Sequence, residues 1–250
     1  MLSNNGEETR LTISSWFAGR TVVVTGVGGE GQVGEVVARA FADQGASLAL
    51  VDRTAASVEA RAASIAASGH QVRPYTCDLT DEAAVARLAT EVRAAHGDAI
   101  HALVHLAGGF AMSGPVADST SETWNRQIAI NLTTAYFTTR AFLPALRAGK
   151  GALLYFASEA ALPGKTGSNR SAYAAAKTAV VTLMESVAGE ERSNGVRANA
   201  VAPSSIRTAA NVAAMGDEIR YVEREEVAAV VTFLCSDAAS AVSGVVVPLT

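Results

Sequence analysis

Residues 21–34 have the sequence TVVVTGVGGEGQVG. Three consecutive valines between threonines predict a buried strand, because β-branched side chains fit a pleated sheet. Apolar side chains recur at helical spacing in the next segment, so residues 34–44 are predicted to form a helix. Glycines between a strand and a helix let the backbone turn sharply and approach a pyrophosphate, which then lies at the N-terminus of the helix. We therefore predict that the turn binds phosphate, the alternative being a purely structural turn, and the residues concerned are Gly26, Gly28, Gly31 and Val33.

The same alternation of apolar runs and helical patterns continues along the chain. Strands are predicted at 21–25, 47–51, 71–76, 102–106, 152–157, 196–201 and 245–247. Helices are predicted at 34–44, 57–67, 81–96, 121–147 with a break near Pro144, 171–192 and 225–234. The strands show no polar alternation, which indicates a parallel sheet buried on both faces. We expect an α/β fold: one doubly wound, Rossmann-like domain over residues 1–250 with a seven-stranded parallel sheet, in which residues 1–16 form an N-terminal extension.

Charge and composition exclude several classes of partner. The formal charge is −4 over 250 residues, so no basic surface invites nucleic acid or anionic lipid. The uncharged stretch between Asp98 and Asp118 contains histidines, glycines and a proline, which indicates a strand and loop rather than a membrane helix. Cys77 and Cys235 match no metal-ligand spacing, and no signal-peptide pattern precedes the first strand. We expect a cytoplasmic protein with free thiols, no bound metal and no membrane contact.

Carboxylates follow the second and third predicted strands. Asp52 stands where a side chain would accept hydrogen bonds from the adenosine ribose and repel a 2′-phosphate, although it could simply start a turn. Arg53 follows at once and could weaken that preference. Asp78 either reaches the adenine or caps the next helix. Asp52, with Glu30 and no Arg or Lys in the glycine turn, favours NAD over NADP, while NADP stays possible.

The strongest local motif is Tyr173-Ala-Ala-Ala-Lys177 within a predicted helix. A spacing of i, i+4 places both side chains on one face of the helix, one turn apart. A free phenol has a pKa near 10, and a neighbouring ammonium lowers that pKa by stabilising the phenolate. Such a tyrosine can exchange a proton with a carbonyl or an alcohol. The motif therefore predicts acid–base chemistry on an oxygen atom.

With the glycine turn, Asp52, Asp78 and the Tyr173–Lys177 pair in this order, the sequence resembles the short-chain dehydrogenase/reductase family from about residue 17 to residue 248. The segment WNRQIAIN resembles the helix that carries the family's catalytic Asn131, and FAS resembles the strand end that carries its catalytic Ser158. The resemblance implies that Tyr173 transfers the substrate proton and that Lys177 lowers its pKa and binds the nicotinamide ribose. It also implies that Ser158 binds the reacting oxygen and that Asn131 holds a water on a proton relay.

The resemblance implies further cofactor contacts. The segment 199–203, ending in Pro203, would border the nicotinamide, and Thr208 would contact the carboxamide or the pyrophosphate. The other cofactor-binding residues that it implies are Leu79, Ala107, Gly108 and Ile206.

Some positions depart from the family pattern. The family's TGxxxGxG turn is lengthened here by two residues, and Gln32 stands where the middle glycine would fall. The usual Asn-Asn-Ala-Gly on the fourth strand is His105-Leu-Ala-Gly108, so we interpret His105 as a core histidine. Ser158 and Tyr173 are two positions further apart than is usual, and Ser204 replaces a glycine.

These features predict an oxidoreductase that transfers a hydride between a nicotinamide cofactor and a small, largely apolar ketone or secondary alcohol. A nucleotide-binding methyltransferase would leave the catalytic residues unexplained, and a non-catalytic dinucleotide sensor is the remaining alternative. The predicted substrate pocket comprises Phe110, Met112, Glu159, Leu162 and residues 206–221. Surplus apolar residues on the helix at 171–192 predict a homo-oligomer, a tetramer or a dimer, unless neighbouring loops cover them.

Overall fold

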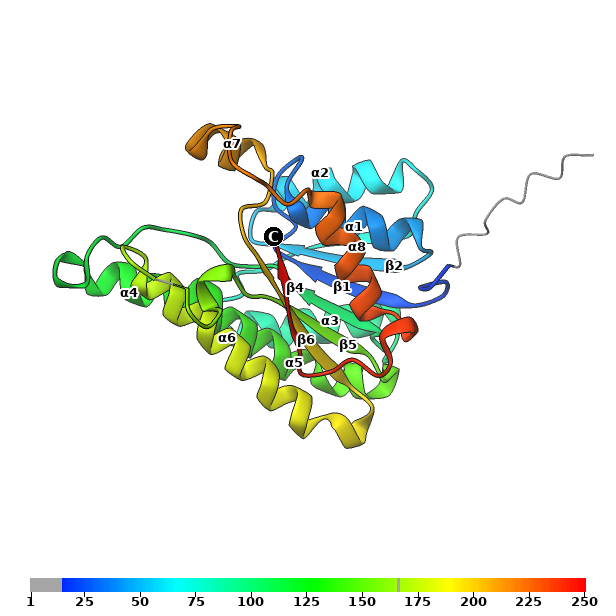
Figure 1. The fold of residues 1–250 in the computed structure, drawn as a ribbon. Coiled ribbons are helices and arrows are strands. Elements are labelled where there is room, and N and C mark those ends of the chain that lie inside the picture. The colour runs from blue at the N-terminus through cyan, green and yellow to red at the C-terminus, as the bar shows by residue number, and fades with distance from the viewer. Residues whose placement is uncertain (1–14, 166) are drawn as a thin grey trace, which may run out of the picture.

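Seven parallel strands form one sheet in the computed structural model, which describes residues 15–165 and 167–250. The strand order is β3-β2-β1-β4-β5-β6-β7 (Figure 1). The strands are β1 Thr21–Thr25, β2 Ser47–Asp52, β3 Val72–Thr76, β4 Ala102–His105, β5 Ala152–Phe156, β6 Arg197–Pro203 and β7 Val246–Leu249. The predicted α/β fold with a doubly wound parallel sheet is confirmed. Residues 1–14 of the predicted N-terminal extension lie outside the described part of the chain.

The chain reverses its direction of travel across the sheet at β1. From β1 it proceeds to β2 and β3 on one side, and it then returns to place β4 on the other side of β1. The connections that leave β1 and β4 therefore diverge at the carboxyl edge of the sheet. In open α/β sheets this divergence produces a crevice that binds ligands.

Helices cover both faces of the sheet, as Figure 1 shows. One layer contains α1 Val33–Asp43, α2 Ala55–Ala66 and α8 Arg224–Cys235, and the other contains α3 Glu82–His96, α5 Thr134–Gly149 and α6 Ser171–Glu190. The valines of β1 show why the strands lack polar alternation. Val22 and Val24 pack into the first core cluster and Val23 packs into the second, all without solvent exposure.

The long helix predicted at 121–147 is interrupted, but not at Pro144. It consists of α4 Ser121–Ile128, a π-helical turn Ala129–Thr133 and α5, and Pro144 lies within α5. Side chains compete for backbone groups at the interruption, since Asn131 Nδ2 donates to the Gln127 carbonyl at 3.1 Å and Thr134 Oγ1 donates to the Ile130 carbonyl at 2.8 Å. Such competition opens the regular helical ladder. The predicted break at Pro144 is therefore wrong.

The short helix α7 Ala209–Met215 is absent from the sequence-based prediction. Thr208 caps it by accepting from the Asn211 backbone N–H at 3.2 Å, and Gly216 ends it with φ +79°. A capping threonine before an alanine-rich run and a glycine after it were the available signals. Among the described residues, no helix is both long and apolar enough to cross a membrane.

His105 is buried at the end of β4, between the sheet and α5. Its Nδ1 lies 3.1 Å from Thr25 Oγ1 and its Nε2 lies 3.3 Å from Thr134 Oγ1. Burial, together with the charge of Lys177, lowers the pKa of His105 to about 3, so the imidazole is neutral in the folded protein. The interpretation of His105 as a hydrogen-bonded core histidine agrees with these contacts.

Replacing His105 with alanine should lower the free energy of unfolding at neutral pH by about 2 kcal/mol or more, because two buried hydroxyls lose a partner. The unfolded chain takes up a proton on His105 below about pH 6.5, whereas the folded protein does not until about pH 3. The free energy of unfolding of the wild type therefore falls as the pH is lowered from about 6.5 toward 3, and the variant lacks that loss. Urea unfolding should show a gap between the two proteins that is about 2 kcal/mol narrower at pH 5.0 than at pH 7.5. An equal gap at both pH values would contradict a neutral, buried His105.

Candidate active site

The glycine turn after β1 packs directly on the loop that follows β4. Gly26 has φ +70°, and a Cβ atom at this position would lie 2.5 Å from the backbone nitrogen of Ala107. A Cβ atom at Gly34 would lie 2.6 Å from the carbonyl oxygen of Gly26. Neither position has space for a side chain, so glycine is required for the two loops and the start of α1 to meet.

Two adjoining cavities open at this carboxyl edge of the sheet, and they share Gly26, Gly108, Gly109 and Phe110. The first has a volume of about 310 Å³ and the second about 350 Å³. The predicted residues that line the first are Gly26, Gly28, Val33, Gly108, Ser158, Tyr173, Lys177, Pro203 and Ile206. Those that line the second are Gly26, Asp52, Arg53, Asp78, Leu79, Ala107 and Gly108.

Three of the predicted catalytic and cofactor-binding residues do not line these cavities, as far as the described chain shows, and neither do Met112, Glu159 and Leu162 of the predicted substrate pocket. Gly31 is bonded within the turn, Asn131 lies in the π-helical turn and Thr208 caps α7. The sequence-based reasoning also missed lining residues, although the glycine turn itself contained two of them. The missed residues include Gln32, Gly34, Gly109, Phe156 and Ser204.

Tyr173 projects from the first turn of α6 into the first cavity. The ring of Phe110 meets its ring edge-on, with centroids 5.1 Å apart and an interplanar angle of 87°. Burial raises the pKa of Tyr173 above its usual value, while a hydrogen bond with Ser158 and the charge of Arg170 oppose that rise. The net direction is opposite to the lowering expected from the sequence, because desolvation of the phenolate outweighs the favourable contacts.

Lys177 lies one helical turn beyond Tyr173 and is buried. Its Nζ donates to the Phe156 carbonyl oxygen at 2.7 Å and lies 5.8 Å from the centroid of the Tyr173 ring. Burial lowers the pKa of Lys177 to about 8. The amine is therefore held at the end of β5 and can change its protonation state near neutral pH.

Asn131 fixes the loop that separates the two cavities. Its Oδ1 accepts from the Gly109 backbone N–H at 3.2 Å, and its Nδ2 donates to the Gly109 carbonyl at 3.0 Å. Its Nδ2 also lies within hydrogen-bond distance of the Gln127 carbonyl and side chain, at 3.1 and 3.2 Å. A Cβ atom at Gly108 would lie 2.6 Å from Asn131 Oδ1 and 3.4 Å from Lys177 Nζ. The described contacts of Asn131 are thus structural ones that hold the loop beside Lys177.

Two carboxylates, Asp52 and Asp78, line the second cavity and make different hydrogen bonds. Asp52 Oδ2 accepts from the Gly28 backbone N–H at 2.9 Å, and its Oδ1 accepts from the Thr54 N–H at 3.1 Å. Asp78 accepts from the backbone and the hydroxyl of Thr80, and these hydrogen bonds lower its pKa. Asp81, not Asp78, caps α3. Of the two roles considered for Asp78, the helix cap is therefore excluded.

Known proteins are similar to this chain in sequence. A family model described as enoyl-(acyl carrier protein) reductase matches residues 26–249. D-threitol dehydrogenase of Mycolicibacterium smegmatis is 33% identical over 238 residues, covering 90% of this chain and 89% of its own. Meso-2,3-butanediol dehydrogenase of Serratia marcescens is 34% identical over 245 residues, covering 93% and 94%.

Solved structures of related proteins have a similar fold. A structure of NAD+-bound xylitol dehydrogenase superposes with a TM-score of 0.84 at 28% identity, over 93% of this chain and 98% of that one. A putative NAD(P)-dependent gluconate 5-dehydrogenase from Beutenbergia cavernae with bound NADP at low occupancy has a TM-score of 0.84 at 33% identity, over 94% and 96%. The fold and the comparisons define a nicotinamide-dependent oxidoreductase. The chain belongs to the short-chain dehydrogenase/reductase family, which confirms the resemblance found in the sequence.

The crevice suits an elongated dinucleotide, because its two cavities adjoin across Gly108 and end at Tyr173 on one side and at Asp52 on the other. Gly108→Ala should weaken NADH binding at least about tenfold, since its Cβ would displace Asn131 or Lys177 at the junction. Gly189→Ala on α6 is the matched control, because its Cβ would meet nothing within 4 Å and the position lines neither cavity. Fluorescence titration with NADH measures both, and equal affinities of the two variants would contradict this account of the junction.

Proposed function

We propose that the protein is an NAD-dependent dehydrogenase of small, largely apolar secondary alcohols and the corresponding ketones, with Tyr173 as the acid/base. One observation carries the proposal: the Tyr173 hydroxyl is hydrogen-bonded to Ser158 and lies one helical turn from the buried Lys177, in a cavity that adjoins the Asp52 cavity. A tyrosine, a hydroxyl donor and an amine arranged in this way can move a proton to or from an oxygen atom.

The bound nicotinamide would supply the hydride acceptor or donor. In ketone reduction Tyr173 gives its hydroxyl proton to the carbonyl oxygen, and in alcohol oxidation it takes that proton back. Ser158 Oγ holds the reacting oxygen beside the phenol. Lys177, fixed to the Phe156 carbonyl, restores the proton on Tyr173 and binds the ribose, while Asn131 keeps the loop at Gly108 and Gly109 in place. Asp52 and Asp78 would bind the adenosine end.

The rim of the first cavity supports an apolar substrate. Phe110 lines both cavities and is 58% exposed, although large apolar side chains are usually buried. The charge of Glu159 is neutralised by an ion pair with Lys165. The relatives named after threitol and butanediol act on small alcohols by their names, which supports the size of the proposed substrate.

The exposed apolar side chains on the helices support a homo-oligomer, a tetramer or a dimer. Trp124 on α4 and Tyr136 on α5 are 44% and 47% exposed, and Phe233 on α8 is 40% exposed. Burial of such side chains against a second copy would stabilise the assembly. The two free, buried cysteines, Cys77 and Cys235, suit the cytoplasm, where we place the protein.

Tyr173→Phe should lower kcat/KM at least about a hundredfold in both directions while NADH binding is kept, because it removes only the transferable proton. In the wild type the pKa of Tyr173 is raised, so the phenolate fraction should still be growing at pH 9. Alcohol oxidation should therefore accelerate from pH 7 to pH 9.5 without a plateau, and the residual rate of the variant should lack this rise. Steady-state rates with a panel of alcohols and ketones measure both effects. A wild type that binds NADH but turns over no substrate would instead favour a dinucleotide sensor.

Asp52 should set the preference for NAD over NADP, because a 2′-phosphate beside it would meet a like charge. Asp52→Asn should shift the ratio of kcat/KM for NAD and NADP toward NADP by about tenfold. Loss of its bond to Gly28 would weaken both cofactors alike, so the ratio isolates the effect of charge. A wild type that prefers NADP, or a ratio that the substitution leaves unchanged, would contradict this role.

A further inference from the structure

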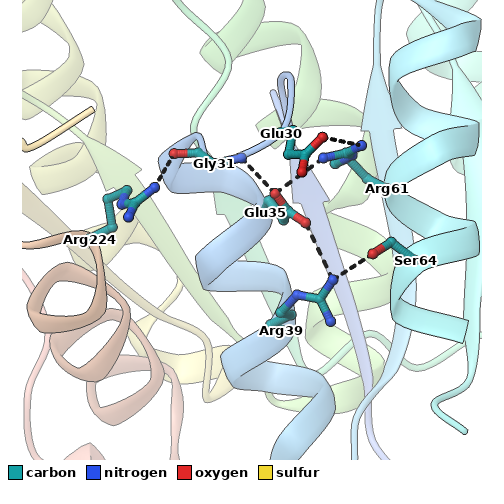
Figure 2. A network of polar contacts seen from close by, with 7 residues as sticks. All are labelled: Glu30, Gly31, Glu35, Arg39, Arg61, Ser64 and Arg224. Atoms are coloured by element: carbon teal, nitrogen blue, oxygen red, sulfur yellow. Dashed lines mark hydrogen bonds and ion pairs between the residues drawn. The ribbon is translucent and has the colours of Figure 1, made fainter. Parts of the chain in front are cut away.

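Gly31, in the lengthened glycine turn, is held by both of its backbone polar groups. Its N–H donates to Glu35 Oε2 at 2.8 Å, and its carbonyl oxygen accepts from Arg224 Nη1 at 2.5 Å (Figure 2). Glu35 belongs to α1 and Arg224 begins α8, so the two bonds reach the turn from different helices. Gly31 has φ +69°, and a Cβ atom there would lie 3.2 Å from Arg224 Nη1. The extra residues of the turn are thus tightly held.

The carboxylate of Glu35 is buried, with its side chain 10% exposed, and it is paired with two arginines. Arg61 Nη1 lies 3.3 Å from one of its oxygens and Arg39 Nη2 lies 3.4 Å from the other. Arg61 also lies 3.8 Å from Glu30, and Arg39 donates to Ser64 Oγ at 2.7 Å (Figure 2). A buried carboxylate near a phosphate site would otherwise be unfavourable, and these guanidinium groups neutralise it.

The start of α8 also holds the opposite wall of the crevice. Glu223, which precedes Arg224 and caps α8, accepts from Arg207 Nε at 2.7 Å. Arg207 follows Ile206, which lines the first cavity and forms a bridge with Val222. The first residues of α8 therefore connect the glycine turn to the segment after β6, and the dinucleotide would lie between them.

We propose that Glu35 and Arg224 are positioning residues for binding of the cofactor's pyrophosphate. By fixing Gly31, they preorganise the backbone of the lengthened turn that would bind it. The inference rests on the proposed binding of a nicotinamide dinucleotide. Rigid backbone donors bind an anion without first losing conformational freedom, so loosening them weakens binding but leaves the proton chemistry at Tyr173 intact. Each hydrogen bond involves a charged side chain, for which the expected loss is about tenfold in affinity.

The test compares ADP-ribose with adenosine, which lacks the pyrophosphate and the second ribose, by isothermal titration. Glu35→Ala and Arg224→Ala should each raise the Kd of ADP-ribose about tenfold, leave that of adenosine within about twofold, and keep kcat at saturating NADH near the wild-type value. Glu35→Gln and Arg224→Lys keep an acceptor or a donor and should recover part of the affinity. Glu59→Ala on α2 and Arg87→Ala on α3 remove exposed charges of the same sign and should change nothing.

Melting temperatures separate positioning from a merely structural role. If the variants bind both ADP-ribose and adenosine more weakly, or if kcat falls in step with the melting temperature, Glu35 and Arg224 support only the fold. Either result would overturn the inference. If Glu35→Ala does not fold, Arg224→Ala decides, because the Arg224 side chain is 29% exposed and its loss removes one bond to the turn. A wild type that binds neither ADP-ribose nor NADH would overturn the proposed function itself. If the wild type binds both and the Glu35→Ala and Arg224→Ala variants bind them equally well, only the inference is overturned.

Discussion

The backbone contact between Gly26 and Ala107 is the constraint on which the rest of the site depends. β1 and β4 are hydrogen-bonded neighbours, yet the chain leaves them toward opposite halves of the sheet. Their loops must separate within a few residues, and the 2.5 Å between a Cβ at Gly26 and the Ala107 nitrogen shows that they do so in direct contact. A side chain at that point would push the two loops apart and so change the shape of both cavities, which Gly26 lines. The fold and the site thus depend on the same absent methyl group.

Burial of the polar side chains at the site follows from that geometry. Lys177 and Asn131 lie under the loops at the carboxyl edge, where water cannot solvate them, and each is bonded to a backbone group instead, at Phe156 and at Gly109. Such bonds remove the penalty of an unpaired buried group and also fix where the side chain points. The same burial raises the pKa of Tyr173 and lowers that of Lys177. Burial therefore makes the Lys177 ammonium a stronger acid than it is in water, while it disfavours the Tyr173 phenolate.

The sequence was most informative where one short segment determines the outcome. Buried strands and the Tyr173–Lys177 spacing are local patterns, so the sheet and the class of protein were predictable from them. The π-helical turn was not, because the competition of Asn131 and Thr134 for backbone carbonyls depends on side-chain geometry, which the sequence pattern does not show. Nor was the raised pKa of Tyr173, since the sequence shows the neighbouring ammonium but not how much protein surrounds the phenol. The assignment of individual residues to cofactor and substrate stays a prediction, which the two cavities support by gathering most of those residues.

The lengthened glycine turn illustrates how a departure from a family pattern can be accommodated. Two added residues would normally give a loop more conformations, and a loop with more conformations binds a phosphate less well. Here the added length is offset by contacts that a shorter turn would not need, from Glu35 on one side of Gly31 and Arg224 on the other. Glu35 lies four residues after Gly31, in α1, whereas Arg224 lies far along the chain, at the start of α8. The shape of the lengthened turn therefore depends on the packing of α1 against α8 as well as on the glycines themselves.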